Sequence, residues 1–355
     1  MTVSSQHDSS ARAAFAGATT DTPPALVLGA AGFLGLNLVD ALVADGQRPR
    51  CGRRARTNVL ALRQRKVPLV QTDLDVPETL TAAMHGVEVV YHLAGHYPRH
   101  SLDLEKERAL GLARLETVLN AAADSGVRRL VYVSSTATVA PRTDGSASTE
   151  VDLFDTPPRW GTYHDLKWHL ERRALEERRF EVVVACPGAC LGPWDLRVGT
   201  SAMLVGLARG LDVPHPDGVV SWVDVRDVAS GLLALGTVRA PPSRVLFTAE
   251  SLRLQHLLDV AGRFYGVPVP PPMSDADAIA FADAEESRAA QGGSRAALSR
   301  ELVDLIIHGP YIDAGRSKAL PGVTYRPLDE TLRDFDAWAR RVRFIPPKSP
   351  EPPTP

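Results

Sequence analysis

The sequence has 355 residues, of which 44% are hydrophobic and 23% charged, and its formal net charge is −2. A chain of this size can bury a full core, and its charge offers no basic field for nucleic acid or for an anionic membrane surface. We therefore expect a globular protein that binds small molecules, with neither nucleic-acid nor membrane partners.

The N-terminal region separates into a tail and a first folded unit. Residues 1–23 are rich in Ser, Thr and Ala and lack the pattern of a secretory signal, which predicts a disordered tail. The apolar run Leu26–Leu28 then predicts a strand, and the spacing of leucines in Phe33–Ala44 predicts a helix. Asn37 and Asp40 in that helix argue against a membrane span.

Strands and helices continue to alternate along the chain. Apolar runs and helical spacing predict, in order, strand Val67–Val70, helix Glu78–Met84, strand Val87–His92, helix Leu104–Ala123, strand Leu130–Ser134, helix Tyr163–Glu177 and strand Glu181–Cys186. Alternation of this kind implies parallel strands joined by right-handed crossovers. The predicted fold class is therefore α/β, a doubly wound parallel sheet of the Rossmann type.

Beyond Gly192 the alternation loosens into Pro- and Gly-rich turns, which predicts a smaller C-terminal substrate lobe. We expect a dinucleotide-binding domain at 24–190 with a returning segment at about 219–250. The lobe is expected to comprise 191–218 and 251–345. Residues 346–355 contain six prolines, which predicts a second disordered tail.

The cysteines give information about compartment and metal binding. Cys51, Cys186 and Cys190 are too few for a disulfide framework, and no His or Cys cluster has the spacing of zinc ligands. We expect a cytoplasmic protein without a metal site.

A glycine-rich turn between the first strand and helix predicts a dinucleotide site. Gly29, Gly32 and Gly35, with Phe33 and Leu34 between them, allow backbone N–H groups to approach a pyrophosphate. Small residues also allow close helix packing, but the strand before this turn and the helix after it favour cofactor binding.

Arg53 and Arg54 stand at the end of the expected second strand, where NAD-specific sites usually place Asp or Glu against the ribose 2′-hydroxyl. Two guanidinium groups can instead bind a 2′-phosphate, which favours NADP(H) over NAD(H). The alternative is that these arginines belong to a solvated loop.

Two further segments are expected along the cofactor. Asp73 and Leu74 follow the third strand and are placed to contact the adenine. Leu93, Ala94 and Gly95 close the fourth strand, and the last two residues are small enough to let the cofactor pass.

Tyr163 and Lys167 are four residues apart on one predicted helix, so both side chains lie on one face. The chain has only five lysines, which makes this pair informative. An ammonium beside a phenol is expected to lower the phenol pKa, so that Tyr163 exchanges a proton with a carbonyl or hydroxyl oxygen.

Three hydroxyl residues, Ser134, Ser135 and Thr136, follow the fifth strand at the edge where such sheets bind ligands. A hydroxyl there can hydrogen-bond the reacting oxygen. Their spacing does not choose among them.

These motifs together resemble the extended short-chain dehydrogenases/reductases, within the NAD-dependent epimerase/dehydratase family and nearest its dihydroflavonol-reductase-like members. The resemblance runs from about Pro24 to Arg340. It rests on these segments: Gly29–Gly35, Asp73-Leu74, His92–Ala94, Val131–Thr136, Tyr163–Lys167, Pro187-Gly188, Asp224–Ala229 and Ser317–Ala319.

The resemblance implies roles for individual residues. Thr136 takes the position of the catalytic Ser/Thr, Tyr163 that of the acid/base, and Lys167 that of the residue holding the nicotinamide ribose. Pro187 is implied to contact the nicotinamide amide. Arg108 departs from the family, which often has Asn at this position, so a proton relay through that Asn is in doubt.

The predicted reaction is NADPH-dependent reduction of a carbonyl in a small organic substrate, with Tyr163 as general acid. The alternatives are a nucleotide-sugar epimerase of the same family and a non-catalytic NADP(H)-binding sensor. The resemblance also suggests a homodimer. Candidate substrate-lining residues are His96, Tyr97, His100, Trp160, His164, Trp194 and Trp222.

Overall fold

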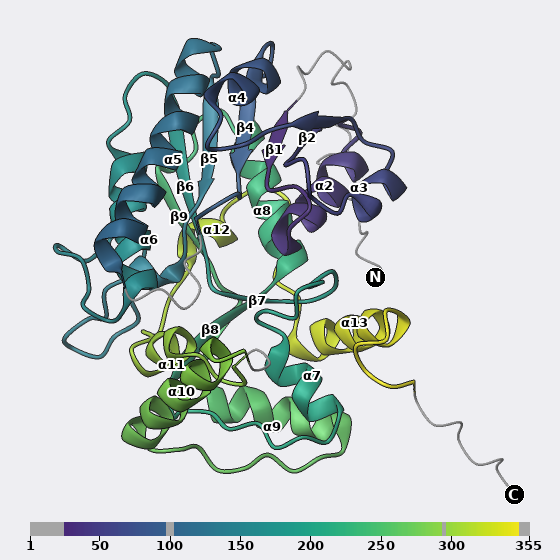
Figure 1. Ribbon diagram of the computed structural model, residues 1–355, viewed down its shortest axis with the longest axis vertical. Coiled ribbons are helices and arrows are strands. Elements are labelled where there is room, and N and C mark those ends of the chain that lie inside the picture. Colours follow the sequence, from purple (N-terminus) through teal and green to yellow (C-terminus); the bar gives the residue numbers. More distant parts are fainter. Residues whose placement is uncertain (1–24, 97–102, 293–295, 348–355) are drawn as a thin grey trace, which may run out of the picture.

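A parallel sheet of seven strands forms the centre of the larger part of the protein (Figure 1). The computed structural model describes residues 25–96, 103–292 and 296–347. The strand order is β3-β2-β1-β4-β5-β6-β9. The strands are β1 (Leu26–Leu28), β2 (Arg50–Arg53), β3 (Leu69–Gln71), β4 (Val89–His92), β5 (Arg129–Val133), β6 (Glu181–Pro187) and β9 (Arg244–Phe247). The order reverses between β1 and β4, and sheets of this type bind ligands at the carboxyl ends of their strands beside such a reversal.

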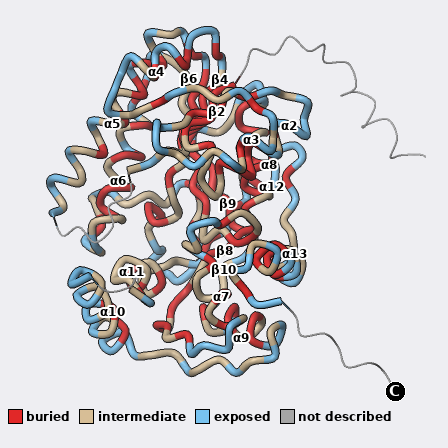
Figure 2. Tube along the Cα trace, turned by 45° about the vertical axis from the view of Figure 1, so that its right-hand side comes forward, coloured by how far each residue is buried: buried red, intermediate tan, exposed pale blue. Residues whose placement is uncertain are grey.

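Helices cover both faces of this sheet, and each face has its own apolar core. One face carries α2 (Phe33–Ala44), α3 (Leu60–Gln64) and α8 (Val225–Thr237). The other carries α4 (Pro77–Met84), α5 (Leu104–Asp124) and α6 (Thr162–Leu175). The central strands are accordingly buried (Figure 2). The structure confirms the predicted doubly wound α/β fold.

The smaller part contains a second sheet and most of the C-terminal helices. Its strands are β7 (Ala189–Leu191), β8 (Val219–Asp224) and β10 (Glu250–Arg253), in the order β10-β8-β7. Its helices are α7 (Ala202–Ala208), α9 (Leu254–Tyr265), α10 (Asp275–Ala290), α11 (Arg300–Ile307) and α13 (Leu328–Arg341), while the short α12 (Gly315–Lys318) lies near β9. Trp222, Phe335 and Trp338 are buried in its largest core.

Local sequence signals account for several helix ends. The side chain of Asp103 accepts a hydrogen bond from the Lys106 N–H at the start of α5, and Ser299 accepts one from the Leu302 N–H at the start of α11. Helix α4 begins with Pro77, which lacks the N–H that would otherwise be unpaired there. None of the helices within the described ranges is long and apolar enough to cross a membrane.

The returning segment expected at 219–250 is divided between the two parts. Helix α8 and strand β9 belong to the large unit, whereas β8 pairs with β7 and β10 in the small sheet. Gly188, between β6 and β7, allows the chain to pass close to β8, because a Cβ at this position would lie 2.1 Å from the carbonyl oxygen of Ser221. The close approach of two backbones is a tertiary feature that apolar periodicity does not report.

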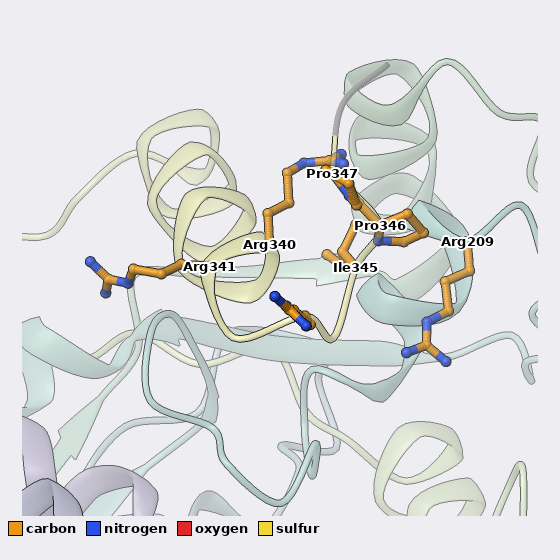
Figure 3. Close-up of a pocket in the computed structure, with 7 residues that line it drawn as sticks. Arg209, Arg340, Arg341, Ile345, Pro346 and Pro347 are labelled. Carbon is orange, nitrogen blue, oxygen red and sulfur yellow. Dashed lines mark hydrogen bonds between the residues drawn. The ribbon is translucent and has the colours of Figure 1, made fainter. Parts of the chain in front are cut away.

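The expected tails lie almost entirely outside the described residues. Pro346 and Pro347 are exceptions, because they line a hollow of about 590 Å³ beside Arg209, Arg340 and Ile345 (Figure 3). The Arg340 guanidinium also donates to the carbonyl of Pro346. The first two residues of the proline-rich segment therefore contact the lobe.

Candidate active site

The turn between β1 and α2 has the close backbone packing that a cofactor cradle needs. Gly29 has φ +87°, and a Cβ on it would lie 2.8 Å from the backbone nitrogen of Ala94. A Cβ on Gly35 would lie 2.2 Å from the Gly29 carbonyl oxygen. No side chain caps α2, whose N-cap is Gly32. The N-terminal N–H groups of Phe33 and Leu34 are thus available for an anion, as the fit of a pyrophosphate requires.

The end of β4 lies against this turn. The Leu93 N–H donates to the Leu28 carbonyl at 2.9 Å, and this bond extends the pairing of β1 with β4. A Cβ on Gly95 would lie 3.7 Å from Nζ of Lys167. The segment from Leu93 to Gly95 therefore connects the glycine turn to the lysine of α6.

Arg53 is the last residue of β2, and Arg54 is exposed immediately after it. Among the residues that the structure describes, neither guanidinium forms a hydrogen bond or a short ion pair with a protein group. Arg50 differs, because it donates to the carbonyls of Ala83 and His85. The guanidinium groups of Arg53 and Arg54 therefore retain N–H donors for a ligand phosphate.

Asp73 and Leu74 form the turn after β3. The Asp73 N–H donates to the Thr79 hydroxyl at 2.9 Å, and its carboxylate accepts from the Asp75 N–H at 3.1 Å. Leu74 packs at the edge of the core that contains α4 and α5. These contacts hold the turn at the carboxyl edge of β3, beside the edge of β2 that ends in Arg53.

The serine hydroxyl beside Tyr163 belongs to Ser135, and the two side chains are hydrogen-bonded. Strand β5 ends at Val133, and Ser135 is still extended, with φ −162° and ψ 156°. Thr136, the residue implied by the resemblance, already starts the short 3-10 helix η1 (Thr136–Thr138). The structure therefore brings Ser135, one residue earlier, to the tyrosine.

Lys167 lies one turn after Tyr163 on α6, with its Nζ 5.7 Å from the tyrosine ring centroid. Lys167 is buried, and burial lowers its pKa, although the negative charges of Glu171 and Glu301 oppose this change. His92 is buried as well, and its burial, together with the nearby positive charge of Lys167, lowers its pKa to about 3. His92 is therefore neutral at physiological pH.

The pKa of Tyr163 moves in the direction opposite to the one expected from sequence. Burial raises it above the ordinary value for a tyrosine, and the hydrogen bond with Ser135 only partly offsets the rise. The negative charge of Glu301 raises it further. The phenol therefore keeps its proton at neutral pH, because the effect of desolvation is larger than that of the hydrogen bond with Ser135.

Pro187 closes β6, opposite Phe247 of β9. The following Gly188 N–H donates to the Phe247 carbonyl at 3.0 Å, and the chain then enters β7 of the small sheet. Pro187 thus lies at the carboxyl end of a central strand, at the point where the chain leaves the large sheet and enters the lobe.

Arg108 has a structural partner close to Tyr163 and Lys167. Its guanidinium forms a bidentate ion pair with Asp165, with distances of 3.0 and 2.8 Å. Asp165 is buried on α6, between Tyr163 and Lys167 in sequence. The arginine therefore ties α5 to α6, which is a different use of this position from an amide relay.

A buried polar network behind the site was not found by sequence reasoning. Glu171 is fully buried on α6 and accepts hydrogen bonds from Ser134 at 2.5 Å and Thr138 at 2.8 Å. Its other oxygen pairs with Nε of Arg244 at 2.5 Å. Glu171 follows Lys167 by four residues, so the sequence could have placed it on the same face of the helix. Its pairing with Arg244 could not be predicted in this way, because Arg244 lies on β9, far along the chain.

The aromatic candidates for the substrate pocket have different environments. Trp222 is 2% exposed in the lobe core, and it packs there instead of lining a pocket. Trp160 stacks on His308, and His164 is buried beneath it with Nδ1 3.1 Å from the Trp160 carbonyl. Trp194 has φ 78° and lies under the Arg65 guanidinium, with 4.4 Å from Cζ to the ring.

The histidines of the loop after β4 are only partly described. His96 has Nε2 against Glu107 and Nδ1 2.9 Å from an Arg114 nitrogen, so both ring nitrogens are engaged by protein. Tyr97 and His100 lie outside the described residues. Within the ranges that are described, no three His, Cys, Asp or Glu side chains are grouped so that they could hold a metal ion.

Comparison with known proteins identifies a family match. The model of the NAD dependent epimerase/dehydratase family matches residues 25–245. A protein of Synechocystis sp. named "Putative dihydroflavonol 4-reductase" is 27% identical over 327 residues, covering 90% of this chain and 95% of its own. These matches cover the glycine turn, the serine and tyrosine segments and both sheets.

Solved structures share the fold at low sequence identity. A nucleoside-diphosphate-sugar epimerase from Pseudomonas aeruginosa superposes with a TM-score of 0.76 at 23% identity, over 91% of this chain and 99% of that one. Yeast methylglyoxal/isovaleraldehyde reductase Gre2 complexed with NADPH gives a TM-score of 0.67 at 20% identity, over 90% and 99%. Reductases and an epimerase thus share this architecture.

Proposed function

The chain belongs to the NAD-dependent epimerase/dehydratase family, whose members bind NAD(P), and from this premise we propose that it is an NADP(H)-dependent carbonyl reductase. The observation that carries the proposal is the hydrogen-bonded pair of Ser135 and Tyr163 beside buried Lys167, at the carboxyl edge of the sheet. The similarity to a protein named as a dihydroflavonol 4-reductase supports the same reaction class.

The glycine turn would hold the pyrophosphate, and Lys167 would hold the nicotinamide ribose. When bound, the dinucleotide supplies a hydride to the carbonyl carbon. Ser135 orients the carbonyl oxygen by hydrogen bonding, and Tyr163 transfers its proton to that oxygen, so that the carbonyl becomes an alcohol and NADP+ remains. Since burial raises the pKa of Tyr163, the tyrosine is protonated as this direction requires.

The reaction class is tested by titrating NADPH by fluorescence and then offering a panel of carbonyl compounds, including acetophenone and its α-substituted derivatives. We expect net NADPH consumption with at least one ketone or aldehyde. An epimerase returns its cofactor to the starting oxidation state. Conversion of a nucleotide sugar without net consumption of NADPH would therefore favour the epimerase alternative. Tight NADPH binding without turnover of any compound would favour a sensor.

Ser135 is proposed to have the role that the resemblance assigns to Thr136. We expect Ser135→Ala to lower kcat about a hundredfold, because it removes a donor to the reacting oxygen. Thr136→Val is the matched control, and we expect it to leave kcat nearly unchanged. If the threonine variant were the damaged one, the assignment would return to Thr136.

The preference for NADP(H) is proposed to depend on Arg53 and Arg54. We expect Arg53→Glu with Arg54→Glu to raise the Kd of NADPH about a hundredfold, because two charge-assisted bonds to the 2′-phosphate are lost. The Kd of NADH is expected to change much less. Arg48→Glu, at an exposed arginine before β2, is the control. Equal losses for both cofactors would contradict the proposed preference.

A further inference from the structure

Helix α6, which carries Tyr163, begins without a side-chain cap. Its N-cap residue is Gly161, which has φ +99° and no side chain to accept a hydrogen bond from the first turn. Tyr163 is the second residue of the helix, so the phenol moves with this turn. The first turn of a helix also carries the positive end of the helix dipole. Its position is therefore sensitive to what packs against it from other elements.

Helix α11 of the lobe lies against this point of the chain. Oδ2 of Asp304 lies 3.2 Å from the position that a Cβ on Gly161 would take. Asp304 is 5% exposed, and its Oδ1 pairs with Nε of Arg300 at 3.1 Å. A carboxylate at the start of a helix interacts favourably with the dipole. Asp304 thus supplies, from another helix, the negative charge that an acidic capping residue would supply.

At the end of α11, His308 holds the residue before the cap. His308 follows the last residue of α11, and its ring stacks on Trp160 with centroids 4.3 Å apart and planes inclined by 12°. The Trp160 ring is also in edge contact with Phe154 and His164, with centroids 5.1 and 5.7 Å apart. The lobe therefore contacts two successive residues at the point where the chain enters α6.

Packing holds α11 itself in place. Val303 is buried in a small core with residues of α10, and Ile306 is buried in the larger core of the lobe. A Cβ on Gly218 would lie 2.2 Å from the Ile306 carbonyl oxygen, and one on Gly309 would lie 2.3 Å from the Val219 carbonyl oxygen. The backbone of the helix end therefore touches the backbone at the start of β8, which gives α11 a firm support.

The first turn of α6 is thus supported from two sides. On the side of the large unit, Arg108 of α5 forms its bidentate ion pair with Asp165. On the side of the lobe, the support comes from Asp304 and His308. Loss of one support would let the turn shift, and a misplacement of about 1 Å at a reacting group can cost about a hundredfold in rate.

We propose that Asp304 and His308 are positioning residues, which fix the first turn of α6 and thereby align the Tyr163 hydroxyl with the substrate carbonyl. Both act through the helix and not on the reacting atoms. This inference rests on the proposed reductase function, in which Tyr163 donates the proton. The lobe then contributes to catalysis through the geometry of α6.

The experiment compares His308→Ala and His308→Phe on a ketone that the native protein reduces. In His308→Ala the stacked ring is lost, and we expect kcat to fall about tenfold while the KM of the ketone and the Kd of NADPH stay within about twofold. His308→Phe restores an aromatic ring against Trp160 and is expected to recover most of the native kcat. Hydrogen–deuterium exchange of residues 160–168 is a readout independent of turnover, and we expect it to be about tenfold faster in His308→Ala.

Asp304→Asn tests the other contact, because it keeps the shape of the side chain and removes its charge. We expect kcat to be about three- to tenfold lower, again with little change in KM. This variant decides the matter if His308→Ala does not fold, as thermal unfolding would show. His256→Ala, at an exposed histidine of α9, is the matched control and should leave kcat and exchange unchanged.

Native kcat in folded His308→Ala and Asp304→Asn proteins would overturn the inference and leave the reductase proposal intact. A loss confined to KM would also overturn it, since the two residues would then act on substrate binding. So would a loss of kcat that His308→Phe does not restore. Absence of NADPH consumption by the native protein with every ketone would instead contradict the proposed function, and the exchange measurement would still test the contact between α11 and α6.

Discussion

Tyr163→Phe is expected to lower kcat for carbonyl reduction by about 100- to 10,000-fold, since it removes the proposed proton donor. The phenylalanine ring fills the same space beside Lys167, whose Nζ is 5.7 Å from the ring centroid. NADPH affinity and the thermal midpoint should therefore change little. Steady-state kinetics on any ketone that the native protein reduces, with a fluorescence titration of NADPH, measure both quantities.

The pH profile adds a second test of the same residue. Burial raises the pKa of Tyr163, so we expect no loss of activity from its deprotonation between neutral and mildly alkaline pH. Tyr311→Phe, at an exposed tyrosine of the lobe, is the control for removing a phenol oxygen. Full turnover by Tyr163→Phe would show that another group donates the proton.

The fold was predictable where local sequence determines the structure. The expected helix Leu104–Ala123 corresponds to α5 at Leu104–Asp124, and the expected strand Glu181–Cys186 corresponds to β6 at Glu181–Pro187. The strand expected at Val67–Val70 is observed at Leu69–Gln71, because short strands have boundaries set by their neighbours. The small sheet was not predicted, since its pairing depends on the approach of β7 to β8 across Gly188.

The candidate site shows the same limit at the scale of one residue. Sequence placed three hydroxyls after β5, but which of them meets Tyr163 depends on where the extended backbone ends. Ser135 is the last extended residue before the 3-10 helix, and it is the residue that meets Tyr163. The resemblance implied the next residue, Thr136. The pKa of Tyr163 likewise depends on burial, which the spacing of Tyr163 and Lys167 does not report.

Glu171 and Arg244 illustrate what spacing along the chain cannot show. They lie 73 residues apart, yet their side chains form an ion pair that is almost fully excluded from water. Arg244 also donates to the Thr138 hydroxyl and the Glu150 carbonyl. The network thus joins α6, the end of β5 and β9 immediately behind the proposed catalytic residues.

Glu171→Leu is expected to lower the free energy of unfolding by about 3–5 kcal/mol, because it leaves the buried Arg244 guanidinium without its counter-charge. The double variant Glu171→Leu with Arg244→Met replaces the pair by apolar side chains of similar size, and we expect it to recover most of the loss. Urea unfolding followed by circular dichroism measures both values. Asp329→Asn, which removes one partner of an exposed ion pair on α13, is expected to change stability little.

The same double variant separates stability from catalytic alignment. Glu171 accepts a hydrogen bond from Ser134, the residue before Ser135, so removing the carboxylate also releases the end of β5. We therefore expect the double variant to fold stably and still to reduce ketones with a lower kcat than the native protein. Native kcat together with restored stability would show that the network holds the fold without positioning Ser135, and a double variant as unstable as the single one would contradict the apolar replacement.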